Sequence, residues 1–218
     1  MTLAGFRLIA FDLDGTLIDS RRDIADAANV LLERAGAGRL PEAEIGRMVG
    51  DGAAALVARA FAAAGRPAPP DALDQFLRIY DAALLVHTRT YPGVAAVLAA
   101  LSSSHALAVL TNKPLGATRR ILDGLDLARF FDPAAVLGGD GPLPRKPDPA
   151  GLRHLMARAG TGVGDTLLVG DSTIDWRTGQ AAGVQVWLAG YGFGFGTVAA
   201  ETAAAARVIG NPSDLIKL

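Results

Sequence analysis

The feature that most constrains the fold is a recurring unit in which a short apolar strand ends in polar residues and is followed by a helix. Leu8–Phe11 is such an apolar run, and the polar segment 12–16 follows it directly. The same order returns at residues 106–112 and 166–172. Short apolar runs bounded by turn signals are typical of buried strands, and strands that alternate with helices predict a parallel sheet covered on both faces. We therefore predict an α/β fold with a doubly wound parallel sheet.

A helical block interrupts this alternation after the first strand. Apolar residues recur at helical spacing in residues 23–35, 53–64 and 72–87, with a Pro-rich break before the last of these. No strand pattern appears within the block, so we interpret it as an insertion that caps the edge of the sheet. We predict a core made of residues 1–15 and 90–218 and a helical cap made of residues 16–89.

The later part of the chain returns to strands and helices. Asp148 is expected to be the N-cap of a helix whose first residue is Pro149. The remaining predicted elements are helices at 115–125, 149–159 and 174–182, strands at 134–137 and 184–188, and a helix in the Ala-rich segment after residue 196.

Polar side chains gather where three of the predicted strands end. In a parallel sheet, ligands bind at the carboxyl ends of the strands. Asp12 and Asp14 follow the first strand, Thr111 the second, and Asp171 a later one, while Lys146 lies in a loop after the weak strand 134–137. Each of these residues alone has a structural explanation, such as a helix cap or a solvated charge. Together they predict one site that combines carboxylates, a hydroxyl and an ammonium group.

Composition limits the classes of function. The chain has 218 residues, of which 50% are hydrophobic and 20% charged, so a sizeable core can be buried. The net charge of −1 indicates neither a nucleic-acid partner nor an acidic membrane. The chain has no Cys, which excludes disulfides and thiolate chemistry. Because no signal peptide pattern and no membrane-spanning apolar run are present, we expect a soluble, cytoplasmic protein. We further expect a monomer or a homodimer.

The polar segments resemble the four motifs of the haloacid dehalogenase superfamily, whose members are mostly phosphatases. Residues 12–16 match the first motif, Asp-x-Asp-Gly-Thr. Thr111 matches the second motif, Lys146 the third, and the segment 170–175, with Asp171 and Asp175, the fourth. The four motifs occur in order and the resemblance covers nearly the whole chain. Within the superfamily, the second aspartate and the metal-type fourth motif favour phosphoryl transfer over carbon–halogen cleavage.

Other segments are similar to phosphoglycolate phosphatases in particular. They are Thr111-Asn112-Lys113-Pro114, Gly138-Gly139-Asp140, Lys146-Pro147-x-Pro149, Gly190-Tyr191-Gly192, Tyr91-Pro92-Gly93-Val94 and Val49-Gly50-x-Gly52. The pair Arg21-Arg22 and the Gly-Phe repeat after Tyr191 depart from that pattern, near the place where substrate selection is expected.

The resemblance implies a role for each residue of the site. Asp12 is the expected nucleophile and Asp14 the expected general acid and base. Mg²⁺, which favours oxygen ligands, is the expected cofactor. Its implied ligands are the carboxylates of Asp12 and Asp171 and the backbone carbonyl of Asp14. Thr111, Asn112 and Lys146 are expected to hold the phosphate, and Asp175 and Ser172 to orient these groups from outside.

The cap is expected to select the substrate. Arg21, Arg22, Arg47 and Asp51 are the candidates, because an Arg would suit a carboxylate on a small phosphorylated metabolite. The role of Lys113, at the phosphate or at the following helix, stays open.

Several functions remain compatible with the sequence. The leading hypothesis is a magnesium-dependent phosphatase acting on 2-phosphoglycolate. The alternatives are a sugar-phosphate phosphatase, for example for N-acetylmuramate 6-phosphate, a pyrophosphatase, or a phosphomutase. A non-catalytic phospho-ligand-binding module is the alternative from another class. The intact set of expected catalytic residues in this chain argues against that alternative.

Overall fold

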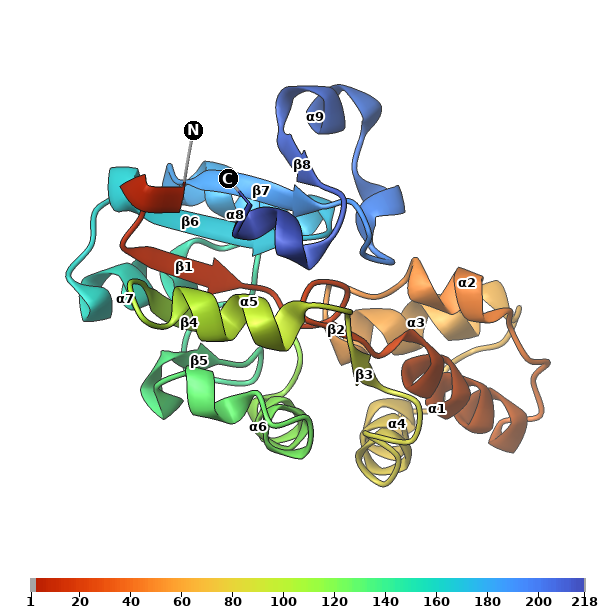
Figure 1. The fold of residues 1–218 in the computed structure, drawn as a ribbon. Helices are drawn as coiled ribbons and strands as arrows, with labels where there is room; N and C mark the ends of the chain where they lie inside the picture. Colours follow the sequence, from red (N-terminus) through yellow and green to blue (C-terminus); the bar gives the residue numbers. More distant parts are fainter. Residues whose placement is uncertain (1–2, 218) are drawn as a thin grey trace.

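The computed structural model describes residues 3–217, and its core is the predicted parallel sheet (Figure 1). The strands of this sheet run in the order β5-β4-β1-β6-β7-β8, and every neighbouring pair is parallel. Its strands are β1 (Leu8–Phe11), β4 (Ala106–Leu110), β5 (Val136–Leu137), β6 (Thr166–Gly170), β7 (Gln185–Ala189) and β8 (Arg207–Ile209). The α/β fold predicted from the sequence is confirmed.

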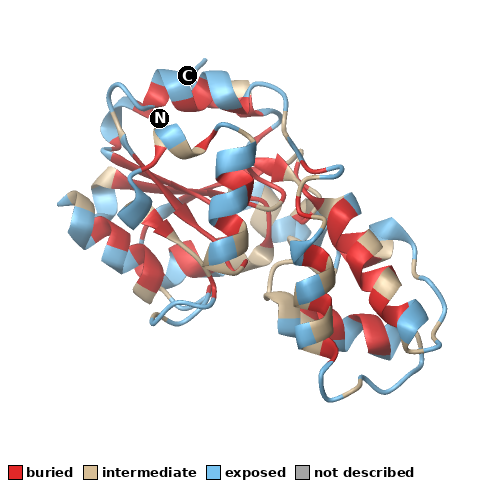
Figure 2. Ribbon diagram, turned by 90° about the horizontal axis from the view of Figure 1, so that it is seen from below, coloured by how far each residue is buried: buried red, intermediate tan, exposed pale blue. Residues whose placement is uncertain are grey.

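Strand β1 sits in the centre of the sheet and shows how the two layers of helices form. Its residues alternate between the two faces, so Ile9 and Phe11 belong to one apolar cluster and Leu8 and Ala10 to the other. The first cluster includes residues of α5 (Val94–Leu101) and α6 (Leu115–Gly124). The second includes residues of α7 (Ala150–Ala159) and α8 (Thr173–Ala182). Figure 2 shows the buried sheet between helices whose outer faces are exposed.

The register of the central strands aligns their carboxyl ends. Phe11 of β1 pairs with Val109 of β4 and with Val169 of β6. Asp12 therefore lies within two positions of Thr111 on one side and of Asp171 on the other. Three polar residues that are far apart in the sequence thus meet at one edge of the sheet.

The helical cap lies beyond this edge (Figure 1). The chain leaves the core through β2 (Ile18–Asp19) and returns through β3 (Arg89–Thr90), and the two strands form a small antiparallel sheet. The cap helices are α1 (Arg21–Arg34), α2 (Glu42–Gly46), α3 (Ala53–Ala63) and α4 (Ala72–Asp81). Buried Leu32, Phe61 and Phe76 pack among these helices.

A buried carboxylate in α1 holds the returning segment. The side chain of Asp23 accepts hydrogen bonds from the backbone N–H groups of His87 and Thr88 at 2.8–2.9 Å, and from the Thr88 hydroxyl at 2.7 Å. The helix predicted over residues 72–87 accordingly ends at Asp81, because the backbone near residue 87 is used by Asp23 rather than by helical hydrogen bonds.

Other local predictions need correction. Pro149 is the N-cap of α7 and Asp148 precedes it, although the Asp148 side chain still accepts a hydrogen bond from Ala150 N at 2.8 Å. The strand expected at 134–137 shrinks to β5 because Asp132 caps a 3₁₀ turn over Pro133–Ala135. Helices α2 and α5 and strands β2, β3 and β8 were not predicted, since they are short or lack clear periodicity. The Ala-rich helix is α9 (Ala200–Ala205).

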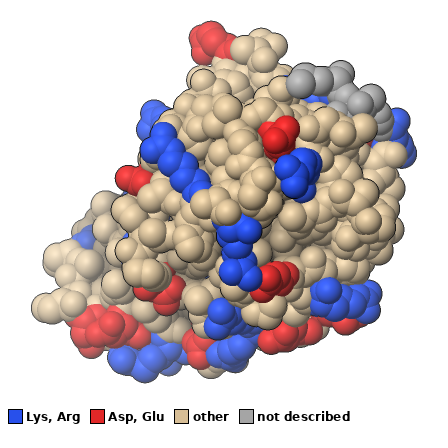
Figure 3. Space-filling model, turned by 90° about the vertical axis from the view of Figure 1, so that its left-hand side faces the viewer, with Lys and Arg blue, Asp and Glu red and all other residues tan. Residues whose placement is uncertain are grey.

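The face of the core turned away from the cap carries charges of both signs, interspersed among uncharged residues (Figure 3). Among residues 3–217, no helix has the length and hydropathy needed to cross a bilayer.

Candidate active site

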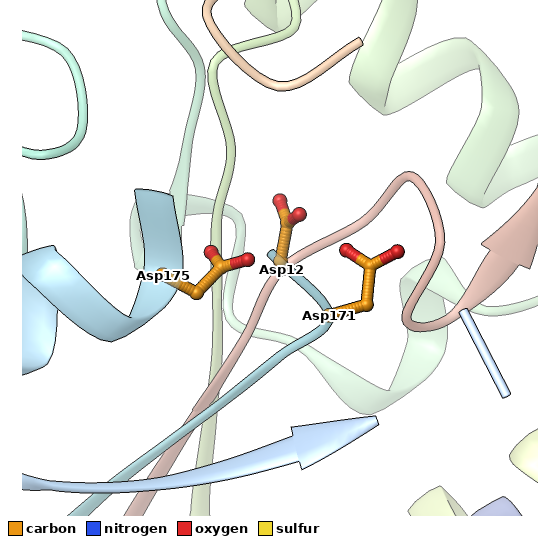
Figure 4. Close-up of side chains that lie close together, drawn as sticks. All are labelled: Asp12, Asp171 and Asp175. Carbon is orange, nitrogen blue, oxygen red and sulfur yellow. The ribbon is translucent and has the colours of Figure 1, made fainter. Parts of the chain in front are cut away.

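Three buried carboxylates face one another at the carboxyl edge of the sheet (Figure 4). Asp12 follows β1, Asp171 follows β6, and Asp175 lies in the first turn of α8. Each offers an oxygen that lies within 4.8 Å of the others, and the side chains are almost inaccessible to solvent. Carboxylates at this separation repel one another strongly in a buried site, so the cluster requires positive charge.

Lys146 supplies part of that charge. Its ammonium group lies 2.8 Å from Asp12 Oδ1 and donates a hydrogen bond to Asp175 Oδ1 at 2.7 Å. Although burial opposes its charge, Asp12 and then Asp175 hold the pKa of Lys146 above its usual range. The second oxygen of Asp175 accepts hydrogen bonds from the backbone N–H and the hydroxyl of Ser172, in a capping box at the start of α8. Asp175 is thus positioned by Ser172 and in turn orients Lys146.

One lysine does not neutralise three carboxylates. Burial raises the pKa of Asp12 to about 7, against the opposing effect of Lys146 and with a further rise caused by Asp175. Burial also raises the pKa of Asp171 well above its usual value, and Asp175 and then Asp12 add to this effect. The site therefore has an excess of negative charge and offers oxygen ligands, which fits a hard divalent cation such as Mg²⁺.

Glycines shape the space around Asp171. Gly194 N–H donates to Asp171 Oδ2 at 2.7 Å. A Cβ at Gly15 would lie 1.9 Å from the same oxygen, and Gly15 has a φ of +89° that other residues rarely adopt. Main-chain segments thus approach Asp171 closely and fix the direction of its carboxylate toward Asp12.

The Asp14 carboxylate is held by a different set of partners. Lys113 Nζ donates to both Asp14 oxygens at 2.9 Å, and the Ser20 hydroxyl donates to Asp14 Oδ1. The structure thereby gives a partner to Lys113, whose role was open in the sequence. The predicted metal contact of Asp14 involves its backbone carbonyl and stays a prediction.

Thr111 and Asn112 occupy the loop after β4, beside the carboxylates. Thr111 Oγ1 accepts a hydrogen bond from Lys113 N at 3.2 Å, and its side chain is buried. Asn112 Nδ2 donates to the carbonyl of Gly50 in the cap at 2.8 Å and to that of Lys146 at 2.9 Å. Asn112 therefore joins the cap to the loop that carries Lys146, and its predicted contact with phosphate stays a prediction.

A cavity between core and cap opens onto these residues. Its core side includes Asp12, Asp14, Thr111, Lys113 and Asp171. Its cap side is apolar except for Tyr80 and backbone. The lining residues from the cap are Ile24, Val49, Gly50, Gly52, Ala53, Leu56, Phe76, Leu77 and Tyr80.

The four cap residues predicted to select the substrate lie outside this lining. Arg21 pairs with Asp19 and Glu42, and Asp51 pairs with Arg59. Arg22 is exposed with Asp26 3.9 Å away, and Arg47 is exposed. Their role in substrate selection stays a prediction. Tyr80, which lines the cavity, was not among the residues predicted from the sequence.

Comparison with known proteins identifies the family of this chain. A model of the haloacid dehalogenase-like hydrolases matches residues 9–189, which include all the carboxylates described above. The chain belongs to this family. The resemblance seen in the four motifs is confirmed. Family membership agrees with the convergence of Asp12, Lys146 and Asp171 at one edge of the sheet.

Similar proteins within the haloacid dehalogenase-like family are named phosphoglycolate phosphatases. The Rhodospirillum rubrum protein of that name is 44% identical over 197 residues, which cover 86% of this chain and 80% of the relative. That of Caulobacter vibrioides is 37% identical over 85% of this chain and 79% of its own length. The crystal structure of a predicted phosphoglycolate phosphatase from Haemophilus somnus matches with a TM-score of 0.89 and 30% identity, over 100% of this chain and 98% of that one.

Proposed function

We propose that the protein is a magnesium-dependent phosphatase that hydrolyses 2-phosphoglycolate through an aspartyl-phosphate on Asp12. The observation that carries the proposal is the position of Asp12. Its carboxylate lines the cavity beside Thr111, within reach of Lys146 and of Asp171, while Asp14 lines the same cavity. The proposed nucleophile, the proposed acid/base group and the proposed metal ligand Asp171 thus line one space, and the proposed phosphate-binding Lys146 contacts the nucleophile from behind this lining.

The residues would divide the reaction between them. Asp12 attacks phosphorus in line and displaces the leaving group. Asp14 must be protonated at the first step, when it gives a proton to the leaving oxygen, and it later takes one back from the water that hydrolyses the aspartyl-phosphate. Lys146 and Thr111 hold phosphate oxygens as their charge redistributes. A Mg²⁺ ion held by Asp12, Asp171 and the Asp14 carbonyl would offset the repulsion between the carboxylate and the phosphate dianion.

The cavity favours a small substrate over the alternatives. A sugar phosphate needs hydrogen-bonding partners for several hydroxyl groups, whereas the cap contributes mostly apolar side chains to the lining. A phosphomutase needs a second acid/base group on the cap side of the cavity. Within the described part of the cap, Tyr80 is the one titratable side chain in the cavity lining, so the cap supplies neither a carboxylate nor an imidazole for that role. The names of the similar proteins agree with 2-phosphoglycolate.

The remaining expectations belong to the same proposal. We propose a cytoplasmic enzyme that works as a monomer or homodimer. Its partner is a small phosphorylated metabolite, with no nucleic acid or membrane involved.

The test is hydrolysis of an aryl phosphate and of a panel of phosphorylated two- and three-carbon acids, sugars and nucleotides. We expect activity only with Mg²⁺, 2-phosphoglycolate as the preferred substrate, and at least a ~10³-fold loss of kcat in Asp12→Asn. Asp74→Asn, which changes an exposed carboxylate, is the matched control. Activity that survives with chelator, or in Asp12→Asn, would refute the mechanism.

A further inference from the structure

Lys113 is a buried cation that the reaction described above does not use. Its side chain is 5% exposed, lines the cavity and lies with Nζ 4.6 Å from the centre of the Tyr80 ring. An ammonium group has three donors, and Asp14 accepts at 2.9 Å from Nζ with both of its oxygens. The other polar neighbour of Nζ is Tyr80, so the ammonium group keeps donor capacity beyond its pair with Asp14.

Tyr80 presents a second unused donor at the same place. It comes from α4 of the cap, is 5% exposed, and its hydroxyl has no hydrogen-bond partner among the described residues. A buried hydroxyl without a partner is costly and indicates a group that is still to be bound. Burial raises the pKa of Tyr80 to about 12, so the hydroxyl keeps its proton at neutral pH and can donate it.

The position of these donors relative to Asp14 identifies what they would bind. Asp14 is the group expected to contact the leaving oxygen of the substrate, and Lys113 contacts Asp14 directly. In 2-phosphoglycolate a single methylene separates that oxygen from a carboxylate. A group that lies beside Asp14, and on the cap side of the phosphate site, is therefore within reach of the carboxylate.

We propose that Lys113 and Tyr80 together form the subsite that recognises the carboxylate of the leaving group, one donor from the core and one from the cap. The Lys113 ammonium group binds one carboxylate oxygen and the Tyr80 hydroxyl donates to the other. The apolar walls formed by Ile24, Leu56 and Phe76 strengthen these charge-assisted hydrogen bonds by excluding water. Because the two donors belong to different domains, an anionic leaving group also bridges core and cap. The inference rests on the proposed function and names the residues behind its substrate preference.

The test compares two substrates of equal length in each variant. One is 2-phosphoglycolate and the other is 2-hydroxyethyl phosphate, which replaces the carboxylate by an uncharged alcohol. The readout is the ratio of their kcat/KM values, because a general loss of activity through the contact with Asp14 affects both substrates and cancels.

We expect Lys113→Met to lower this ratio by ~100-fold and Tyr80→Phe, which keeps the ring, by ~10-fold. The loss should appear mainly as a raised KM for 2-phosphoglycolate, since the carboxylate is bound before and during the reaction. Lys113→Arg keeps a cation and should restore part of the ratio. Lys217→Met removes the same charge from an exposed position and should leave the ratio unchanged.

The outcomes separate the two ideas. If the wild-type protein prefers 2-phosphoglycolate and both variants lose the two activities by the same factor, the carboxylate subsite is refuted while the proposed function stands. If the wild-type protein hydrolyses neither ester, the proposed function itself fails. Thermal unfolding of each variant shows whether the fold is kept, and a variant that does not fold is replaced by Lys113→Gln in the same comparison.

Discussion

The two sides of the cavity are built by opposite means. The core side consists of charged groups that fix one another, as Ser172 fixes Asp175, Asp175 fixes Lys146, and Lys146 pairs with Asp12. The cap side is mostly apolar, and the charged side chains of the cap lie outside the cavity lining, as Arg59 and Asp51 do in their pair. Preorganised charges are what phosphoryl transfer needs, whereas a dry apolar wall needs only shape. The difference teaches that the groups suited to chemistry lie in the core and that the cap serves to exclude water from the cavity. Tyr80 is the exception, because it brings a polar group from the cap into the lining.

The prediction with the largest expected effect tests the core side of the cavity by adding a single methyl group. Gly15→Ala places a Cβ against Asp171 at a backbone conformation that Ala disfavours. We expect the Mg²⁺ concentration for half-maximal activity to rise by about 10–100-fold, because Asp171 can no longer hold its direction. Titration of Mg²⁺ with an aryl phosphate as substrate measures this.

Gly5→Ala is the control for that variant, since no atom lies within 4 Å of the position of its Cβ. An unchanged Mg²⁺ requirement in Gly15→Ala would show that the Asp171 carboxylate is not positioned for the metal.

A smaller effect concerns stability and pH. Without a bound cation, Asp12 has a pKa raised from 3.8 to about 7, so its protonated form is favoured by folding. The contribution of this protonated carboxyl group to the free energy of unfolding is complete below about pH 4 and is lost as the pH rises through 7. In the proposed function Mg²⁺ binds the ionised carboxylates, which would remove the penalty. We expect the gain in Tm caused by saturating Mg²⁺ to be about 5 °C larger at pH 8 than at pH 5.

Differential scanning calorimetry at the two pH values, with Mg²⁺ or with chelator, measures that gain. Asp12→Asn should reduce the pH dependence. A Tm gain that is equal at both pH values would contradict the account of the carboxylate cluster.

The smallest effect is expected from the surface of the cap. Arg22→Gln and Arg47→Gln alter exposed side chains outside the cavity lining, and surface charges of this kind contribute little. We expect kcat/KM for 2-phosphoglycolate to change by less than about 2-fold in steady-state assays. A loss above about 10-fold in either variant would break the comparison and return an arginine of the cap to the substrate site.

The same contrast explains what the sequence could predict. Strand β1 and the polar residues after β1, β4 and β6 were predicted because local pattern and sheet topology place them without knowledge of distant contacts. Asp12, Asp171 and Asp175 do converge as expected. Their assignment to a metal and to catalysis rests on the resemblance, because local pattern and topology place the side chains without stating their roles.

The cap contribution was not predictable in the same way. Whether Arg21 or Tyr80 faces the cavity depends on how helices pack on the core, and the pattern of a single helix does not reveal this. Arg21 was a candidate because of its charge, yet Glu42 and Asp19 already neutralise it. Tyr80 carries no charge and was not among the candidates. Lys113 carried a usable signal, since the chain has only Lys113, Lys146 and Lys217 as lysines.

The short segment between Asp14 and the cap has a consequence for engineering. Gly15 N–H bonds to Ile18 O at 2.9 Å, and Ser20, at the start of the cap, donates a hydrogen bond to Asp14. Chimeric enzymes that exchange caps between relatives should therefore place the first junction after Ser20, so that the recipient keeps its own turn and hydroxyl. A junction placed before Ile18 would import a foreign neighbour for the acid/base residue along with the new cap.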